Sequence, residues 1–459
     1  MTLVISNLTN DFIHFIENIR QQPIDKKTYL IAKTRLIDYL GVAISGYHHK
    51  DNNILSLISE EDLVENGFII FGKNYSVSQE NSALINAYNA HLLELDDGHR
   101  VAMVHSGAVI FSVVLPFALR YDVSLKKLLQ AVIIGYEAAI RIAELIQPAH
   151  KLKGYHASAT CGVIGASIAL SVLENSSVKL MKDSMGISLL MTQGLLVAID
   201  DDSNFKPMNI ANAARNAMLA NHLSKIGFKG PDDILGNPRG IINLYSTIQN
   251  KKELVFDFID FSINQTYVKP HAACRHAHPA IDALKKILSK EEIISDDVHS
   301  IIIYTYELAI KGHDSKIINS SSAAKMSIPY SIAAFVVFGH LNQEVYEETS
   351  YRNSRIISIM DKIELVSDDV LTKKVPKERG ARLIIKLMSG ESHTSEISLP
   401  KGEPENPLSE SEILDKFRKL TSGKIKSKTD FIDYFLTEEE KEDQFLDNLR
   451  DIYYYDKGE

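Results

Sequence analysis

The stretch that decides the fold is LLQAVIIGYEAAIRIA, residues 128–143. Its apolar residues recur at intervals of three and four: Leu128, Val132, Ile133, Tyr136, Ala139, Ile140 and Ala143. This spacing places them on one face of an α-helix, whereas a half-buried strand would alternate every second residue. The stretch therefore predicts a long helix with a buried face.

The same helical spacing extends outward on both sides of this stretch. Upstream it includes Leu30, Ala32, Leu36, Leu40 and Val42. Downstream, ASATCGVIGASIALSVL (residues 157–173) is apolar on all sides and rich in small residues, which predicts a buried helix that its neighbours approach closely. Its Gly162 and Gly165 do not follow a strand, so they form no dinucleotide-binding fingerprint. We expect almost continuous helix from about residue 26 to 227, and no bound cofactor.

The character of the chain changes after about residue 267. Residues 299–306 are short and β-branched, and residues 382–388 and 391–399 flank Ser389-Gly390, a hairpin signature. Helical patterns occupy residues 323–339 and resume near residue 409. The predicted fold class is mainly α: a large all-helical domain (residues 1–266), a smaller α/β domain (267–403) and C-terminal helices (404–459) that return to the helical domain.

Composition excludes several classes of function. The 459 residues carry a net charge of -9 with scattered basic residues, which argues against a nucleic-acid partner. The longest apolar run, about residues 108–119, is too short to cross a bilayer. No signal peptide is evident, so we expect no membrane partner and a cytoplasmic location. Cys161 and Cys274 are far apart and form no CxxC pattern, which argues against a disulfide scaffold.

A dense cluster of ionisable residues lies between two helical runs. ELDDGHR (residues 94–100) is followed closely by His105-Ser106-Gly107. Carboxylates, histidines and a cation on a loop held by helices are typical of a binding or catalytic site. Four further clusters have a similar composition: Gly154-Tyr155-His156; residues 200–203 with Lys206-Pro207; Lys269-Pro270-His271 with Cys274-Arg275-His276-Ala277-His278-Pro279; and residues 325–330.

Each cluster also has a purely structural interpretation. Asp96 and Asp97 are consistent with a solvated turn at a helix end, and His156 with a structural histidine. Residues 200–202 are three aspartates that favour a helix N-terminal charge or a solvated loop over a metal site. The metal-binding spacings HExxH and DxDxDG are absent, so we expect no metal. His276 and His278 are two residues apart, so on a helix they diverge.

Taken in order, these clusters resemble the MmgE/PrpD family, which contains 2-methylcitrate dehydratases, cis-aconitate decarboxylases and iminodisuccinate epimerases. The resemblance covers nearly the whole chain and is weakest in the C-terminal tail. It implies that the α/β domain is a lid over a cleft, that the protein is a homodimer, and that no organic cofactor is required. By matching positions, it implies His105, His156, Lys206, His278 and Asp96 as catalytic candidates. Asp97, Lys269, Arg275 and His276 are the candidates for substrate binding.

The chemistry of these residues suits a small polycarboxylate. Lysine and arginine side chains hold carboxylates through charge-assisted hydrogen bonds. Removal of a proton next to a carboxylate needs a positioned base, such as His105 or His156, and stabilisation of the negative charge that develops. Lys206 and His278 are candidates for neutralising that charge or for protonating a leaving hydroxide.

The chain departs from the family pattern at several positions. Glu94 replaces the first aspartate of the acidic motif, Gly98 occupies the usual threonine position, and the usual proline is absent between His105 and Ser106. The lid tyrosine of the decarboxylases has no clear counterpart: Tyr304 and Tyr306 are near, but Ile310 aligns best. These departures weaken the decarboxylase interpretation.

The leading hypothesis is therefore a cofactor-independent lyase, and within that class a hydro-lyase similar to 2-methylcitrate dehydratase. An isomerase is the runner-up, since two opposed bases would epimerise a centre next to a carboxylate; a decarboxylase is a further alternative. A non-catalytic binding protein is a third class, and it predicts that the five clusters do not converge.

Overall fold

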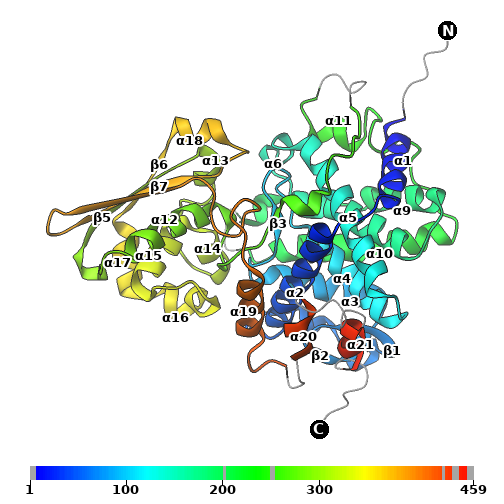
Figure 1. Ribbon diagram of the computed structural model, residues 1–459, viewed down its shortest axis with the longest axis horizontal. Helices are drawn as coiled ribbons and strands as arrows, with labels where there is room; N and C mark the ends of the chain where they lie inside the picture. The colour runs from blue at the N-terminus through cyan, green and yellow to red at the C-terminus, as the bar shows by residue number, and fades with distance from the viewer. Residues whose placement is uncertain (1–6, 200–202, 249–253, 426–429, 437–443, 452–459) are drawn as a thin grey trace.

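The computed structural model describes residues 7–199, 203–248, 254–425, 430–436 and 444–451. Two bodies lie side by side, one built almost entirely of helices and one built of helices around a sheet (Figure 1). The predicted fold class, mainly α with a smaller α/β part, is confirmed. The domain boundaries at residues 266 and 403 remain a prediction.

The helical body is formed by the first half of the chain. Its helices are α1 (Leu8–Arg20), α2 (Lys26–Tyr47), α3 (Gln79–Leu92), α4 (Ser106–Arg120), α5 (Leu125–Ile146), α6 (Ala149–Leu152), α7 (Ala157–Thr160), α8 (Gly162–Leu173), α9 (Val178–Leu190), α10 (Lys206–Lys225) and α11 (Ile241–Tyr245). The deciding stretch lies within α5, whose N-cap Ser124 accepts a hydrogen bond from the Lys127 backbone N–H. The predicted buried helix is α7 and α8, in which every residue is buried.

Small residues let α5 and α8 approach closely, as the sequence predicts. A Cβ added to Gly135 would lie 2.8 Å from the Gly165 carbonyl oxygen, and one added to Gly165 would lie 2.6 Å from that of Gly135. The two backbones are therefore in direct contact, and alanine at either position would force the helices apart.

The expectation of almost continuous helix from residue 26 to 227 is wrong between α2 and α3. Strands β1 (Leu63–Ile70) and β2 (Lys73–Val77) form an antiparallel hairpin there. Ile69, Ile70 and Val77 are buried against the helical body. Such a short apolar stretch has too few residues for its period to separate strand from helix.

The α/β body contains a four-stranded sheet in the order β6-β5-β7-β8. Its strands are β5 (Val298–Thr305), β6 (Ile363–Ser367), β7 (Ala381–Leu387) and β8 (Ser392–Ile397), and its helices are α12 (His278–Leu288), α13 (Glu307–Ile310), α14 (Ser321–Met326), α15 (Ile328–Phe338), α16 (Glu348–Tyr351), α17 (Ser354–Asp361) and α18 (Asp369–Lys374). Strand β5 pairs in parallel with β6, whereas β5–β7 and β7–β8 are antiparallel. The predicted strand near residue 300 and the predicted hairpin are both confirmed. We refer to this body as the lid domain.

Two connections join the bodies. Strand β3 (Gly98–His99) pairs with β4 (Thr266–Tyr267), so the acidic loop is bonded to the segment that enters the lid domain. Helix α19 (Glu410–Thr421) packs against α2, with the Phe417 ring 3.2 Å from where a Gly41 Cβ would lie. The last described helices are α20 (Asp430–Phe435) and α21 (Gln444–Arg450), and Arg450 Nε donates to the Leu119 carbonyl in α4 at 3.2 Å (Figure 1).

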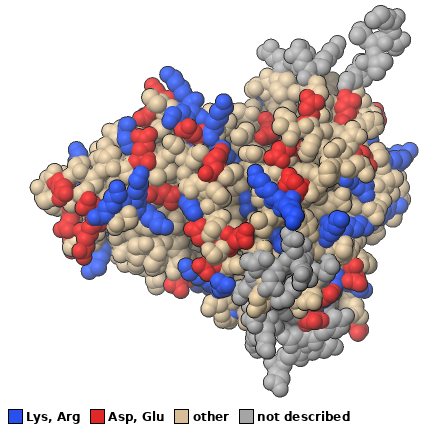
Figure 2. Space-filling model, viewed as in Figure 1, with Lys and Arg blue, Asp and Glu red and all other residues tan. Residues whose placement is uncertain are grey.

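On the face drawn in Figure 2, acidic and basic side chains are interspersed, and neither charge forms a continuous patch. None of the described helices is both long and apolar enough to cross a membrane.

Candidate active site

The acidic loop that follows α3 is shaped by an unusual backbone. Glu94 adopts a left-handed conformation with φ of 53°, as does Met103 with φ of 53°. Non-glycine residues rarely adopt this conformation, and the strain it stores is concentrated at functional sites. Both residues line the same cavity between the helical body and the lid domain. The backbone strain and the cavity therefore identify the same place.

His105 is held in one tautomer by the acidic loop. Its Nδ1 lies 2.7 Å from the Asp97 carbonyl oxygen, which can only accept, so Nδ1 carries the proton and Nε2 is the unprotonated nitrogen. Burial lowers the pKa of His105 to about 3, although the nearby Asp96 carboxylate opposes this shift. His105 is thus a neutral imidazole whose Nε2 lone pair is free to accept a hydrogen bond or a proton.

His156 and Lys206 come from the starts of two helices, α7 and α10. Burial, reinforced by the charge of Lys206, lowers the pKa of His156 well below its ordinary value. The His156 Nδ1 is buried and has no hydrogen-bond partner among the described residues. Lys206 Nζ forms a buried ion pair with Glu94, and both residues line the cavity. His156 is therefore neutral and available, while Lys206 is held in place by a carboxylate.

The lid side contributes the cationic motif. Lys269 Nζ donates to the Glu94 carbonyl oxygen at 3.0 Å and lies 3.6 Å from Asp96 Oδ1. Arg275 Nη2 donates to Glu403 Oε1 at 2.8 Å, and its guanidinium lies 4.6 Å from the centre of the Tyr267 ring. Each of these cations is thus fixed by a buried carboxylate behind it.

The cavity has a volume of about 90 Å³ and is rich in cations. Its ionisable lining residues are Glu94, His105, Lys151, His156, Lys206, Lys269, Cys274, Arg275, His276, His313 and Arg379. The lysines and arginines in this lining outnumber the carboxylates five to one, and the described residues offer no ion pair to Lys151 or Arg379.

One cation that lines the cavity, Arg379, has no anionic partner among the described residues. Its Nη2 donates to the Arg100 carbonyl oxygen, but its buried Nε has no hydrogen-bond partner among the described residues. A buried guanidinium without a carboxylate is costly unless an anion satisfies it, so this cavity suits an anionic ligand.

A second cavity, of about 380 Å³, adjoins the first at the Glu94–Lys206 pair. It contributes Lys50 and Lys325, and burial lowers the pKa of Lys325 to about 8. Its lining also includes Asp51 and Glu348, so the surplus of cations belongs to the smaller cavity.

The structure gathers most of the predicted site residues but not all of them. His105, His156, Lys206, Lys269, Arg275 and His276 line the cavity. Asp96 lies behind it, 2.8 Å from His91 Nδ1 and 3.5 Å from His105 Nδ1. Residues 200–202 lie outside the described residues.

Besides Asp96, two of the predicted residues, Asp97 and His278, do not line the cavity. Asp97 accepts hydrogen bonds from the Gly107 N–H at 3.1 Å and from the Tyr136 hydroxyl at 2.8 Å, and burial raises its pKa to about 7. His278 is fully buried: Arg275 Nη1 donates to its Nδ1 at 3.0 Å, and its Nε2 donates to the Ala273 carbonyl at 3.2 Å. Neither side chain has an atom free for a substrate, so substrate binding by Asp97 and catalysis by His278 do not fit this geometry.

Several residues at the site are not among the candidates that the sequence predicts. His91 lies in the last turn of α3, outside the five clusters, and its Nδ1 is 2.8 Å from Asp96 Oδ2. Lys151, His313 and Arg379 belong to none of the five clusters. Lys151 Nζ lies 3.1 Å from His276 Nε2, and only proximity in space reveals this pair.

The three candidate positions for a lid tyrosine lie outside the cavity lining. The Tyr306 hydroxyl lies 2.6 Å from His276 Nδ1, so Tyr306 reaches the cavity only through His276. Tyr304 stacks with Arg382 on the sheet, and Ile310 carries no polar group. None of these three residues therefore contacts a ligand in the cavity directly.

The two-residue pairing of β3 and β4 sets the distance between the acidic loop and the cationic motif. Gly98 lies directly against Tyr267, and a Cβ added to Gly98 would be 2.5 Å from the Tyr267 hydroxyl oxygen. Glycine at this position therefore makes room for the ring on which Arg275 stacks.

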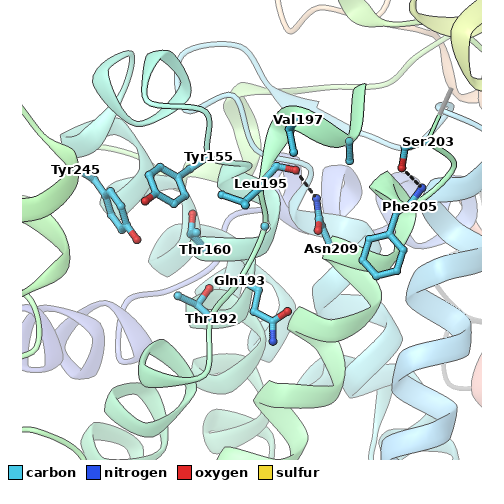
Figure 3. A pocket seen from close by; sticks show the side chains of 12 residues that line it. Tyr155, Thr160, Thr192, Gln193, Leu195, Val197, Ser203, Phe205, Asn209 and Tyr245 are labelled. Atoms are coloured by element: carbon cyan, nitrogen blue, oxygen red, sulfur yellow. Dashed lines mark hydrogen bonds between the residues drawn. The ribbon is translucent and has the colours of Figure 1, made fainter. Parts of the chain in front are cut away.

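A larger cavity, of about 610 Å³, lies on the helical body (Figure 3). Tyr155 lines both cavities, but the larger one is otherwise walled by side chains such as Leu195, Val197 and Phe205, and none of its described lining residues is charged. Because it offers no cation to a carboxylate, we place the candidate active site in the smaller, cationic cavity.

The fold and this cavity define a two-body protein whose site collects acidic, imidazole and cationic groups at the domain junction. The chain belongs to the MmgE/PrpD family: the N-terminal domain model of that family matches residues 10–254, and the C-terminal domain model matches residues 271–435. This is a family of enzymes that act on polycarboxylates.

Individual relatives are similar along almost their full length. The chain is 24% identical over 447 residues to the cis-aconitate decarboxylase-like protein oryM of Aspergillus oryzae, covering 92% of each chain. It is 23% identical to cis-aconitate decarboxylase of Aspergillus terreus, covering 91% of this chain and 90% of that one. The human cis-aconitate decarboxylase is 19% identical, covering 91% and 88%. These names suggest a lyase.

Proposed function

We propose that this protein is a lyase that removes a proton from a carbon next to a carboxylate of a small polycarboxylate and eliminates water. The observation that carries the proposal is the state of His105: a neutral imidazole whose protonated Nδ1 is fixed by the Asp97 carbonyl, in a cavity dominated by cations. A neutral imidazole in a fixed orientation can serve as the proton acceptor of such a step.

In the proposed reaction, the unprotonated Nε2 of His105 takes the proton. The electron pair left on carbon is shared with the adjacent carboxylate, and Lys206 and Arg379 stabilise this charge. As the double bond forms, the hydroxide leaves and takes a proton from Lys151, whose pKa burial lowers to about 8. The products are an unsaturated polycarboxylate and water.

The remaining residues position these groups. Asp96 lies beside the Nδ1 side of His105, and Glu94 holds Lys206 and Lys269. His278 accepts from Arg275 and thereby positions it, rather than contacting the substrate. Asp97 fixes the start of α4 through the Gly107 N–H.

Decarboxylation is the second candidate, because the relatives named above are cis-aconitate decarboxylases or similar to them. In that reaction a carbon–carbon bond breaks, carbon dioxide leaves, and the electron pair ends on a carbon that must receive a proton. Lys151, which is protonated below pH of about 8, would supply it. We place elimination of water first because it uses both the neutral His105 as proton acceptor and Lys151 as proton donor, whereas decarboxylation would use Lys151 alone.

Substrate entry requires the lid domain to move. A cavity of about 90 Å³ is smaller than the roughly 300–1,000 Å³ of ordinary ligand sites, although its neighbour adds about 380 Å³ beyond Glu94. We therefore propose that the lid domain opens to admit the substrate and closes over it.

The test is proton NMR in deuterated water with 2-methylcitrate, citrate, cis-aconitate and iminodisuccinate, using His105→Gln as the control. A new olefinic proton signal from citrate, or conversion of the methyl doublet of 2-methylcitrate into the singlet of a methyl group on a double bond, establishes the dehydratase. A product that has lost carbon dioxide from cis-aconitate establishes the decarboxylase instead. Deuterium exchange without a new carbon skeleton establishes an epimerase. Unchanged spectra with all four compounds would refute the proposal.

A further inference from the structure

The cavity contains a thiol that the proposed reaction does not use. Cys274 Sγ lies 3.8 Å from His313 Nε2, and both residues line the cavity. The backbone fixes this pair, since the Cys274 N–H donates to the Lys325 carbonyl at 2.9 Å and the Ile328 N–H donates to the His313 carbonyl at 2.9 Å. The thiol therefore has a defined neighbour and a defined direction.

His313 is oriented as a proton acceptor for this thiol. Its Nδ1 lies 3.1 Å from the Met326 carbonyl oxygen, which can only accept, so Nδ1 carries the proton. The lone pair of Nε2 then faces Cys274. A thiol whose proton has an acceptor at this position is activated as a nucleophile.

The cations that line the cavity around Cys274 favour a negatively charged reaction partner for the thiol. Lys151 and Arg379, which form no ion pair with a described residue, line the same cavity, and the buried Nε of Arg379 has no hydrogen-bond partner among those residues. Burial alone would raise the pKa of Cys274, but the adjacent His313 outweighs burial and lowers that pKa to about 6. The thiolate and the anion-binding groups thus share one space.

The other cysteine is a matched internal control. Cys161 is fully buried in the helical body, lines none of the cavities described above, and burial raises its pKa to about 12. One chain therefore carries one thiol inside the cationic cavity and one outside it.

We propose that Cys274 and His313 form a covalent-modification site selective for anionic electrophiles, in particular unsaturated carboxylates. His313 Nε2 takes the thiol proton, and the sulfur attacks the β-carbon of the alkene. A sulfur–carbon bond forms, the π electrons move to the carbon next to the carboxylate, and that carbon takes the proton from His313. The adduct is a thioether, and no oxidant or reductant is needed.

This inference rests on the proposed function in one respect. The unsaturated polycarboxylate that elimination of water would produce is itself an electrophile of this class, so accumulated product would modify the enzyme and stop it. The nucleophile itself does not depend on turnover and is tested without it.

The experiment compares alkylation of the native protein by iodoacetate, which is anionic, and by iodoacetamide, which is neutral. Peptide mass spectrometry measures the rate at each cysteine, with glutathione as the reference thiol. We expect Cys274 to favour iodoacetate at least about 10-fold more than glutathione does, because a cationic cavity concentrates anions. Cys161→Ser should keep this preference, and His313→Gln should slow both reagents at Cys274. Maleate should add its whole mass to the Cys274 peptide.

A preference at Cys274 equal to that of glutathione, or faster labelling of Cys161, would overturn the proposal. A missing maleate adduct beside a clear iodoacetate preference would overturn the addition step. If the NMR panel shows no turnover while Cys274 remains anion-selective, the proposed function fails and this site stands. Turnover without selective labelling would instead leave the proposed function standing and overturn the Cys274 site.

Discussion

Glu403 is the buried carboxylate that pairs with Arg275 and Arg100, and replacing it tests how strongly the fold depends on these buried ion pairs. Its side chain is 1% exposed. Its Oε1 lies 2.8 Å from Arg275 Nη2, and its Oε2 lies 2.7 Å from Arg100 Nη1. Glu403→Gln keeps the shape of the side chain but leaves two guanidiniums without this carboxylate.

The expected cost follows from the burial of the pair. Removing one partner of a buried ion pair costs about 3–5 kcal/mol, because the remaining charge is left uncompensated. Glu405 is the matched control: it binds the same Arg100 at 2.6 Å, but its side chain is 45% exposed. An exposed pair is worth at most about 1 kcal/mol, so Glu405→Gln should cost no more than that.

The assay is urea unfolding followed by circular dichroism, since the chain has no tryptophan to report by fluorescence. Glu403→Gln should lower the transition midpoint clearly, and it should raise KM because Arg275 lines the cavity. Equal midpoints for the two variants would refute the view that burial sets the strength of these pairs.

Three further predictions concern the chemistry. His105→Gln should lower kcat about 10²–10⁴-fold with an unchanged circular dichroism spectrum, and activity within a factor of about two would exclude His105 as the base. Arg379→Met should raise KM more than it lowers kcat if its guanidinium binds substrate; steady-state kinetics with Arg382→Met as control decides this. The third prediction concerns pH: Lys151 is charged below pH of about 8 and loses its proton above it, so kcat/KM should fall as pH rises through about 8. His105, with a pKa of about 3, stays neutral at pH 5, so the profile should have no acid limb near 6.5. A pH–rate profile with an acid limb near 6.5 would contradict the neutral state of His105.

Sequence patterns were sufficient for the helices and for part of the site. The period of the apolar residues predicted the helical body, and loop clusters between helices located His105, His156 and Lys206. Contacts between distant segments could not be predicted from the sequence. Arg379 and His313 lie in loops without a motif, and they reach the cavity only because of how the lid domain packs. His91 lies within a helix and outside every cluster, so no sequence pattern was a reason to choose it.

His276 and His278 are two residues apart, and the backbone around them determines which side chain reaches the cavity. The short 3-10 turn Arg275–Ala277 directs His276 toward the cavity, whereas His278 begins α12 and points into the core. The sequence indicated that the two would diverge. It contained no signal for which of them faces the substrate, because that depends on how the turn packs against Tyr306.

The contact between Gly98 and Tyr267 has a consequence for how such sites change over evolutionary time. The Tyr267 ring occupies the volume that a larger residue at position 98 would need, and Arg275 rests on that ring. A threonine at position 98 would therefore require the Tyr267 ring to move, and Arg275 with it. Relatives with threonine there should carry a smaller residue opposite it and hold the arginine differently. A change at position 98 is thus coupled to position 267, in a distant segment, and to the arginine that rests on its ring.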